Sequence, residues 1–353
     1  MPNPVLTRAI DALASREDLS EQQAAEVLAE IMHGEVSETQ IAGFLIALRT
    51  KGETVQELAG LARTMRALAA HVPSTRTDLL DTAGTGGGRR TFNVSTTAAL
   101  IAAGAGCAVA KHGNRSATGP SGSADLLEAL GARIDLDPEG VAKCIEAAGF
   151  GFMFAPAHHR ATRFVVPVRR ELAVRTIFNL LGPLTNPAGA SRQLIGVSDP
   201  GFLETIAGAL VLLGVERALV VSGEDGIDEV SSSAPTHVVE VNGHDIRRYT
   251  LTPEDLGLPP AQATSAAFDP ALAGGTPAEN AEVTRAILAG ERGPRADLAL
   301  ANAGAAIYAA GAAPTPAAGV EAARAAIAEG AAALALERYV SASHSHAPVE
   351  SPS

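Results

Sequence analysis

The sequence contains few cysteines, few aromatic residues and no long apolar run. Its 353 residues include two cysteines and no tryptophan, and aromatic residues make up 3% of the chain. Cys107 and Cys144 alone cannot form a disulfide framework or a zinc cluster, so a reducing compartment fits the chain. The first residues lack the pattern of a signal peptide, and no stretch approaches the roughly 18 apolar residues of a membrane-spanning helix. We therefore expect a cytoplasmic protein without a membrane partner.

An excess of positive charge is also missing. The formal net charge is −12 at pH 7, whereas proteins that bind nucleic acid usually carry a basic domain. We therefore expect no nucleic-acid partner, although locally clustered lysine and arginine side chains can still bind a small anionic substrate. Hydrophobic residues make up 46% of the chain and charged residues 19%, which is ordinary for a globular protein. The chain is long enough for one large domain or for two.

Residues 1–73 have the pattern of a helical unit. Three capping boxes predict helix starts at Ser20 with Gln23, Ser37 with Gln40, and Thr54 with Glu57. Gly34 and Gly52 stand where the first two of these helices should end. Apolar residues recur at helical spacing between residues 41 and 48. Such a stripe packs either in the core of the domain or against a second subunit, and both alternatives stay open.

From residue 74 onward, short apolar runs alternate with helical patterns. The predicted strands are Leu79–Asp81, Cys107–Ala110, Phe150–Phe154, Gln193–Val197, Ala218–Ser222 and His237–Val241. This alternation predicts an α/β fold with a mostly parallel central sheet, whose ligand site lies beyond the carboxyl ends of the strands. A hairpin is expected to turn at Asn242-Gly243.

The alternation is interrupted between residues 161 and 190. A helical stretch, Arg163–Leu172, is followed there by the proline-punctuated segment from Asn179 to Pro187. We interpret residues 161–190 as a crossover that packs on the N-terminal helices. The predicted organisation is therefore a small N-terminal α-helical domain at 1–73 and a larger α/β domain made of 74–160 and 191–342. Residues 343–353 are expected to be a disordered tail.

A glycine-rich segment follows the first predicted strand. The run from Gly84 to Gly88 leads to Asn93 and Ser95 at the expected start of a helix. Glycines let main-chain N–H groups approach an anion, and a helix start adds unpaired donors and a positive dipole end. Turn geometry alone explains roughly half of such clusters, and this one matches neither G-x-G-x-x-G nor the P-loop. It is a candidate phosphate cradle.

Three further groups of polar residues are candidates for binding. Lys111 to Arg115 follow the second predicted strand and should meet the glycine-rich segment at the same edge of the sheet, unless they form only a solvated loop. Asp228 and Glu229 follow the strand Ala218–Ser222 and could bind Mg²⁺, although acidic loops are usually just solvated. Arg169 could bind a carboxylate bidentately, through two of its guanidinium nitrogens, or could lie on the surface of an amphipathic helix.

Several motifs in order resemble the anthranilate phosphoribosyltransferases, which are phosphoribosyltransferases of the nucleoside phosphorylase type. The similarity extends from about Leu6 to Tyr339, and its most specific parts are Gly84–Gly87, Asn93–Thr96, Lys111–Arg115, Ser121–Asp125, Asn179–Pro187 and Asp225–Glu229. The resemblance implies a homodimer that associates through the N-terminal helical domain. It also implies that the 5-phosphoribosyl group of 5-phosphoribosyl 1-diphosphate (PRPP) is transferred to the amine of anthranilate. The products are N-(5-phosphoribosyl)anthranilate and diphosphate, in a Mg²⁺-dependent step of tryptophan biosynthesis.

The resemblance also implies which residues bind each ligand. It places the PRPP contacts at Gly84, Gly87, Gly88, Thr91, Asn93, Val94, Ser95, Thr96, Lys111, His112, Gly113, Asn114, Arg115, Ser116, Ala117, Thr118, Gly119 and Ser123. It places the anthranilate contacts at Gly84, Asn114, His159 and Arg169. Two Mg²⁺ ions per monomer would be held by Ser95, Asp228 and Glu229. No residue is assigned as a general acid or base.

One position departs from the family pattern. This chain has Gly88 where the family has an acidic residue, and its glycine-rich loop is one residue shorter than usual. We hypothesise that Arg89 or Arg90 replaces the missing contact. Two alternatives to the main interpretation are a pyrimidine nucleoside phosphorylase-like enzyme, which shares this architecture, and a non-catalytic relative that binds nucleic acid. The Lys111–Arg115 and Asp228-Glu229 elements fit the first poorly, and the net charge and the acidic pair disfavour the second.

Overall fold

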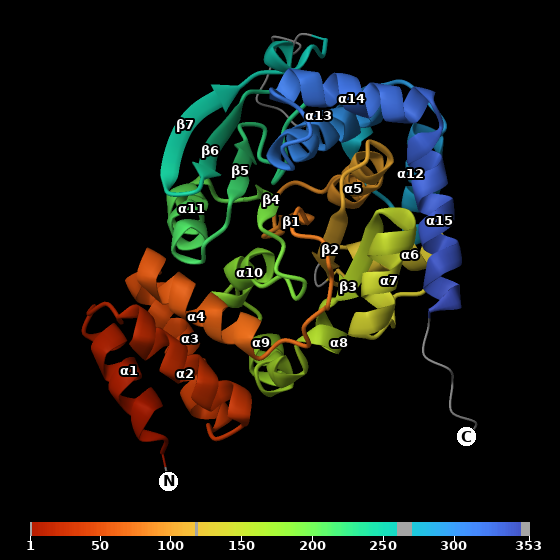
Figure 1. Cartoon of the computed structure of the whole chain (residues 1–353). Helices are drawn as coiled ribbons and strands as arrows, with labels where there is room; N and C mark the ends of the chain where they lie inside the picture. Colours follow the sequence, from red (N-terminus) through yellow and green to blue (C-terminus); the bar gives the residue numbers. More distant parts are fainter. Residues whose placement is uncertain (1, 117–118, 260–269, 347–353) are drawn as a thin grey trace.

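The N-terminal region is a bundle of four helices. The structure is a computed structural model that describes residues 2–116, 119–259 and 270–346 (Figure 1). The helices of the bundle are α1 (Pro4–Ala14), α2 (Glu21–His33), α3 (Glu38–Lys51) and α4 (Val55–Ala67). The capping boxes predicted at Ser20 and Thr54 are both present, and Gly34 ends α2 in the left-handed conformation with φ 79°. These helix ends follow from the local sequence.

The start of α3 differs from the prediction in one contact. The Ser37 side chain accepts from the Gln40 N–H, as a capping box requires. The Gln40 side chain, however, turns to the main chain of Asn3 rather than to Ser37. Its Oε1 accepts from the Asn3 N–H at 2.9 Å, and its Nε2 donates to the Asn3 carbonyl at 3.1 Å. The predicted reciprocal bond is therefore replaced by one that ties α3 to α1.

A seven-stranded sheet with the order β3-β2-β1-β4-β5-β6-β7 forms the centre of the larger region. The strands are β1 (Leu80–Gly84), β2 (Val109–Gly113), β3 (Phe150–Phe154), β4 (Arg192–Gly196), β5 (Arg217–Gly223), β6 (Thr236–Asn242) and β7 (Asp245–Leu251). The first five are mutually parallel, β6 runs antiparallel to β5, and β7 runs antiparallel to β6. Asn242 pairs with Asp245, so the hairpin turns at Gly243-His244, with Gly243 at φ 59°. The predicted α/β class and mostly parallel sheet are confirmed.

Helices cover both faces of the sheet. They are α5 (Val94–Gly104), α6 (Ser123–Ala129), α7 (Pro138–Ala148), α8 (Ala155–His158), α9 (Val166–Leu172), α10 (Phe178–Leu181), α11 (Leu203–Leu212), α12 (Pro277–Leu288), α13 (Pro294–Ala309), α14 (Pro316–Ala328) and α15 (Ala331–Ser345). Short 3₁₀ turns lie at Arg160–Phe164, Gly182–Leu184, Pro200–Phe202, Glu254–Leu256 and Pro270–Leu272. In Figure 1 the sheet lies between the N-terminal bundle (red to orange) and α12–α15 (blue).

Two apolar cores lie on opposite faces of the sheet. Successive strand side chains point to opposite faces, and accordingly Leu194 packs in one core and its neighbour Ile195 in the other. The first core contains α5–α7 and α12–α15. The second contains the four N-terminal helices, α11 and the segment with α9 and α10. This segment contacts α2, α3 and α4, and its Val165, Val168 and Phe178 are buried there.

The C-terminal end of the described chain is helical. Helix α15 continues to Ser345, and Ser343 is buried, with its hydroxyl accepting from the Arg133 N–H at 3.0 Å. The prediction that the tail begins at residue 343 is therefore wrong for residues 343–345. The helix persists because this last turn packs against the residues around Arg133. In the described part of the chain, no helix is both long and apolar enough to cross a membrane.

Candidate active site

The glycine-rich loop connects β1 to α5 at the carboxyl end of the sheet. The Thr85 N–H donates to the Gly196 carbonyl at the end of β4, at 2.8 Å, and the Arg89 N–H donates to the Gly226 carbonyl at 2.9 Å. Gly86 has φ 62° and Gly87 has φ 90°, conformations that glycine adopts without strain. The loop is therefore held at both ends, against β4 and against the acidic loop that follows β5.

Asp228 packs closely against this loop. A Cβ atom on Gly84 would lie 3.1 Å from Asp228 Oδ2, and one on Gly88 would lie 2.5 Å from Asp228 Oδ1. A Cβ on Gly196 would overlap the carbonyl oxygen of Asp228. Glycines from β1, β4 and the loop thus leave space for the side chain and the main chain of Asp228. A larger residue at position 88 does not fit this arrangement, which gives a physical reason for the departure from the family pattern.

Asp228 and Glu229 are an electrostatically strained pair. Burial, with the repulsion of Asp228, raises the pKa of Glu229 well above its usual value, and burial raises the pKa of Asp228. The Gly86 N–H is hydrogen-bonded to the Asp228 carboxylate, and the Ser95 N–H to that of Glu229. A cation would relieve the repulsion. The described residues contain no group of three or more metal-binding side chains, and Mg²⁺ needs only one or two carboxylates with substrate phosphate and water. The donor set therefore fits Mg²⁺.

Lys111 lies inside β2, not in a loop as predicted. Its side chain is buried, and its Nζ donates to the Thr82 carbonyl and lies 3.3 Å from both Thr82 Oγ1 and Ser95 Oγ. Burial lowers the pKa of Lys111, while the nearby charges of Asp81 and Glu229 raise it. The prediction failed because β2 runs to Gly113 through pairing with β3, two residues past Lys111. The structure nevertheless brings Gly84, Lys111 and Asp228 into one cluster.

His112 follows Lys111 on the same strand, and both its main chain and its side chain are hydrogen-bonded. Its N–H donates to Asp81 Oδ1 at 3.1 Å, and its Nδ1 lies 3.1 Å from the Gly182 carbonyl. Burial raises the pKa of Asp81 to about 6 and lowers the pKa of His112 to about 3. His159, just after α8, is also buried, which lowers its pKa to about 4. Both imidazoles are therefore uncharged at neutral pH.

The segment after β2 offers main-chain groups rather than free cations. Arg115 turns its guanidinium to α6, where Nη1 lies 2.8 Å from Asp125 Oδ1 and Nη2 lies 2.9 Å from Glu128 Oε1. Ser123 donates its hydroxyl to the Asn114 carbonyl at 3.1 Å. The remaining residues of this predicted group are placed beside them: Gly113, Ser116 and Gly119. Ala117 and Thr118 lie outside the described residues.

Helix α5 presents its first turn to the cluster. Val94, Ser95 and Thr96 form this turn, and the positive end of its helix dipole suits an anion. The Val94 N–H already donates to the Phe92 carbonyl at 2.7 Å, and the Ser95 N–H to the Glu229 carboxylate. The Asn93 side chain also bonds to other segments of the chain. Its Oδ1 accepts from Ser121 Oγ at 2.9 Å and from Asn280 Nδ2 at 2.8 Å, so it ties the helix start to two other segments. Thr91 lies two residues before Asn93, at the end of the glycine-rich loop.

Arg169 lies on α9 with its guanidinium partly free. Nη2 is 3.4 Å from Asn179 Oδ1, and the guanidinium carbon lies 5.5 Å from the centre of the Phe178 ring. Burial lowers the pKa of Arg169, and among the described residues its buried Nε has no hydrogen-bond partner. A guanidinium with an unused donor is suited to a carboxylate. The four predicted anthranilate residues thus come from β1, the loop after β2, the end of α8, and α9.

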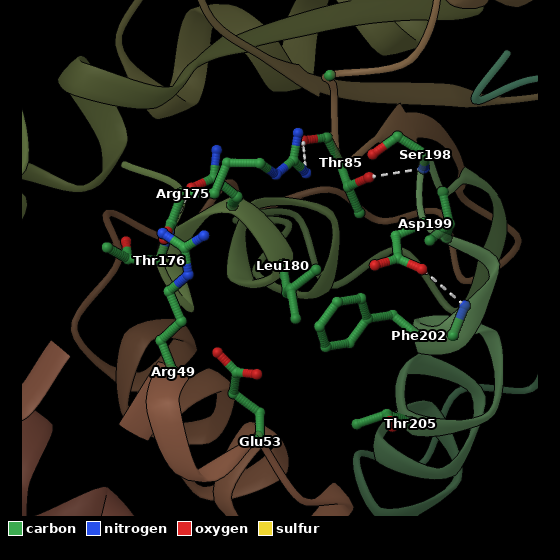
Figure 2. A pocket seen from close by; sticks show the side chains of 15 residues that line it. Arg49, Glu53, Thr85, Arg175, Thr176, Leu180, Ser198, Asp199, Phe202 and Thr205 are labelled. Carbon is green, nitrogen blue, oxygen red and sulfur yellow. Dashed lines mark hydrogen bonds between the residues drawn. The ribbon is translucent and has the colours of Figure 1, made fainter. Parts of the chain in front are cut away.

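Sequence reasoning missed a group of residues beside the glycine-rich loop. A hollow of about 590 Å³ lies between α3, the turn before α10 and the loop, and its lining includes Arg49, Glu53, Thr85, Arg175 and Ser198. Figure 2 shows Arg175 extending to Thr85, with Arg49 and Glu53 on the opposite side. No motif marks Arg175 in the sequence. The link appears only in the structure, where a Cβ on Gly87 would overlap Arg175 Nη1.

Comparison with known proteins identifies the family. The helical bundle domain of a glycosyl transferase family matches residues 7–69, and the a/b domain of that family matches residues 76–333. The anthranilate phosphoribosyltransferase of Roseiflexus castenholzii is 54% identical over 329 residues, which is 92% of this chain and 95% of that protein. The chain belongs to the anthranilate phosphoribosyltransferase family. The resemblance inferred from the sequence motifs is therefore confirmed.

Solved anthranilate phosphoribosyltransferases share the fold. The crystal structure from Thermus thermophilus matches with a TM-score of 0.89 and 49% identity, over 95% of this chain and 99% of that one. The enzyme from Saccharomyces cerevisiae, solved in complex with PRPP and Mg, matches with a TM-score of 0.85 and 28% identity, over 96% of this chain and 98% of that one. Both cover the helical bundle and the sheet, so the likeness is not confined to one part.

Proposed function

We propose that this chain transfers the 5-phosphoribosyl group of PRPP to the amine of anthranilate. The products are N-(5-phosphoribosyl)anthranilate and diphosphate, and the step belongs to tryptophan biosynthesis. One observation carries the proposal: the glycine-rich loop, the start of α5, Lys111 and the pair Asp228-Glu229 form a single cluster at the carboxyl end of the sheet. The complex of the yeast relative with PRPP and Mg supports it.

PRPP would lie along the glycine-rich loop and the first turn of α5. Main-chain N–H groups there suit the phosphate oxygens, and Lys111 adds a positive charge beside Ser95. The full set is the one predicted from the sequence, from Gly84 to Ser123. Arg89 or Arg90 would replace the missing acidic contact at position 88. The Arg89 side chain lies over Gly226, with Nε 3.2 Å from where a Cβ on that glycine would be.

Ser95, Asp228 and Glu229 would hold two Mg²⁺ ions per monomer. Bound Mg²⁺ would neutralise negative charge on the diphosphate as it leaves. The carboxylates keep their places through the N–H groups of Gly86 and Ser95, so a metal site is ready before substrate binds. Lys111 offsets part of the repulsion within the pair.

Anthranilate would bind between Arg169 and the two buried histidines. The Arg169 guanidinium would meet its carboxylate, and Gly84, Asn114 and His159 would contact the rest of the molecule, with His112 beside its path. An aromatic amine is uncharged near neutral pH, so its nitrogen can attack C1 of the ribose without a general base. Catalysis would come from positioning and from neutralisation of charge on the leaving group.

We also propose an arrangement of the chain in the cell. Residues 1–73 with 161–190 form one domain, and the protein is a cytoplasmic homodimer that associates through the helical domain. Sedimentation of the purified protein measures the oligomeric state directly.

The test of the reaction uses the fluorescence of anthranilate. Purified protein with PRPP and Mg²⁺ should extinguish it, and omission of PRPP or chelation of Mg²⁺ should stop the loss. No loss of fluorescence under any of these conditions contradicts the proposal. Phosphorolysis of uridine or thymidine, or a shift of DNA in a gel at physiological salt, would instead support one of the two alternative functions.

A further inference from the structure

Arg175 bonds directly to the main chain of the glycine-rich loop. It follows α9 in the turn where Ala173 takes the left-handed conformation, with φ 52°. Its Nη1 donates to the Gly86 carbonyl at 2.6 Å. Its Nη2 lies 3.3 Å from the carbonyl of Thr85, toward which Arg175 extends in Figure 2. Nearly 90 residues of sequence separate the arginine from the loop. One guanidinium therefore fixes two successive peptide groups.

The orientation of these peptide groups determines what the loop offers to a ligand. A trans peptide is planar, so its C=O and N–H point in opposite directions. The Thr85 carbonyl faces Arg175, and the Gly86 N–H of the same peptide accordingly reaches the Asp228 carboxylate. The next carbonyl, of Gly86, accepts from Arg175 and also from Ser198 Oγ at 2.9 Å. The Gly87 N–H is therefore directed away from Arg175.

The turn that carries Arg175 is anchored on two sides. Arg49 Nη1, on α3, donates to the Arg175 carbonyl at 2.9 Å. The Thr176 N–H donates at 3.0 Å to Asn179 Oδ1, the same oxygen that lies near Arg169 Nη2. The contacts of Arg175 thus connect the helical bundle and the Arg169 segment to the glycine-rich loop.

We propose that Arg175 is a positioning residue for phosphoribosyl transfer. It holds the carbonyl oxygens of Thr85 and Gly86 away from the diphosphate of PRPP, so that the loop presents N–H groups to the anion and to Asp228. This role rests on the proposed function of the site. It gives the helical bundle a part in PRPP binding, because the Arg49 contact fixes the turn from which Arg175 extends.

The test compares Arg175→Ala with Arg175→Lys and with Arg170→Ala. Arg170 is also exposed and lies five residues earlier, on α9, so it serves as the matched control. Arg175→Ala should raise the KM for PRPP at least about tenfold, as loss of charged hydrogen bonds predicts. The KM for anthranilate should change by less than about threefold, on the same scale. Arg175→Lys, which cannot hold both carbonyls, should be intermediate, and Arg170→Ala should resemble the wild type.

Two further measurements separate positioning from general loss of structure. Arg175 is exposed beside the open hollow, so millimolar guanidinium chloride, far below denaturing concentrations, should partly restore PRPP affinity to Arg175→Ala but not to Arg169→Ala. Calorimetric titration of PRPP with Mg²⁺, without anthranilate, should show the same weakening. If Arg175→Ala does not fold, Arg175→Lys carries the same test.

The outcomes distinguish this inference from the proposed function. A wild-type protein without transferase activity contradicts the proposed function. An active wild type whose Arg175 variants bind PRPP normally contradicts only the role of Arg175. Equal losses of PRPP and anthranilate affinity, without guanidinium rescue, would indicate a general structural role and would also overturn the inference.

Discussion

The imidazole rings of His112 and His159 lie 5.0 Å apart, measured between their centroids, and are tilted by 57°. The two residues come from β2 and from the end of α8, and within the described structure neither Nε2 has a hydrogen-bond partner. Burial keeps both rings uncharged at neutral pH. Each also lies near another histidine, and repulsion between two protonated imidazoles would further lower its pKa. The pair therefore offers two flat, neutral faces next to the site proposed for an aromatic substrate.

Acid should weaken the fold through these histidines. The pKa of His159 is about 4 in the folded protein, whereas an unfolded histidine titrates near 6.5, so between these values the unfolded state binds more protons. Stability is therefore lost as the pH falls below about 6.5. Between pH 7 and 5, His159 should account for up to about 2 kcal/mol of the loss in unfolding free energy.

Urea unfolding of the wild type and of His159→Gln at pH 7 and pH 5 measures this contribution. The variant should lose less stability between the two pH values. Asp81, whose pKa is raised to about 6, titrates in both proteins and acts in the opposite direction, so it cancels in the comparison. Identical pH dependence in the two proteins would mean that His159 does not carry this effect.

Arg169→Ala should affect the two substrates unequally. Loss of a guanidinium that binds a carboxylate should raise the KM for anthranilate by about tenfold to a hundredfold. The KM for PRPP should change little, because Arg169 contacts Asn179 and Phe178 and not the glycine-rich loop. Steady-state kinetics with each substrate varied in turn provides the measurement. A larger effect on PRPP would remove Arg169 from the anthranilate site.

Asp228→Asn combined with Glu229→Gln should reduce turnover at least about a hundredfold, because stabilisation of the leaving group would be lost. It should also change the Mg²⁺ concentration that gives half-maximal activity. Both substitutions preserve shape, and the fold should survive since they remove a repulsion between buried carboxylates. The measurement is activity against Mg²⁺ concentration, with unfolding curves as the control. Unchanged Mg²⁺ dependence would contradict the assignment of these residues to the metal.

Gly88→Ala should displace the Asp228 carboxylate and so weaken Mg²⁺ binding. We expect the Mg²⁺ concentration for half-maximal activity to rise by about tenfold, which corresponds to roughly 1.4 kcal/mol of binding free energy. The new Cβ would lie 2.5 Å from Asp228 Oδ1 and 2.8 Å from the Asp228 nitrogen, so the carboxylate and its main chain must move. Gly182→Ala is the control, because a Cβ at Gly182 meets nothing within 4 Å and the residue has φ −48°. If the two variants show the same Mg²⁺ dependence, the loop accommodates the added methyl group without weakening Mg²⁺ binding.

The sequence predicted those features that depend on neighbouring residues. The capping boxes at Ser20 and Thr54 formed because each needs only its own helix. The capping box at Ser37 is incomplete because the Gln40 side chain bonds to the main chain of Asn3, 37 residues away, and not to that of Ser37. The family motifs located the glycine-rich loop and the acidic pair, which the fold brings together.

Features that depend on tertiary packing escaped prediction. Lys111 was expected in the loop after the predicted strand Cys107–Ala110, but pairing with Phe152 extends β2 through it. Arg115 was predicted to contact PRPP, and its ion pairs with Asp125 and Glu128 on α6 were not foreseen. Arg175 had no local signal at all, because its significance comes from carbonyl groups nearly 90 residues earlier in the chain.

The second apolar core has a consequence for any attempt to divide the molecule. Leu58 of α4, Phe178 of the crossover, Ile206 of α11 and Val220 of β5 all belong to it, so the family's two domain matches share one hydrophobic interior. Expressing the sheet region without residues 1–73 would leave that interior open to water and promote aggregation. The bundle thus completes the apolar core on one face of the sheet, and we expect that removing it leaves no functional fragment.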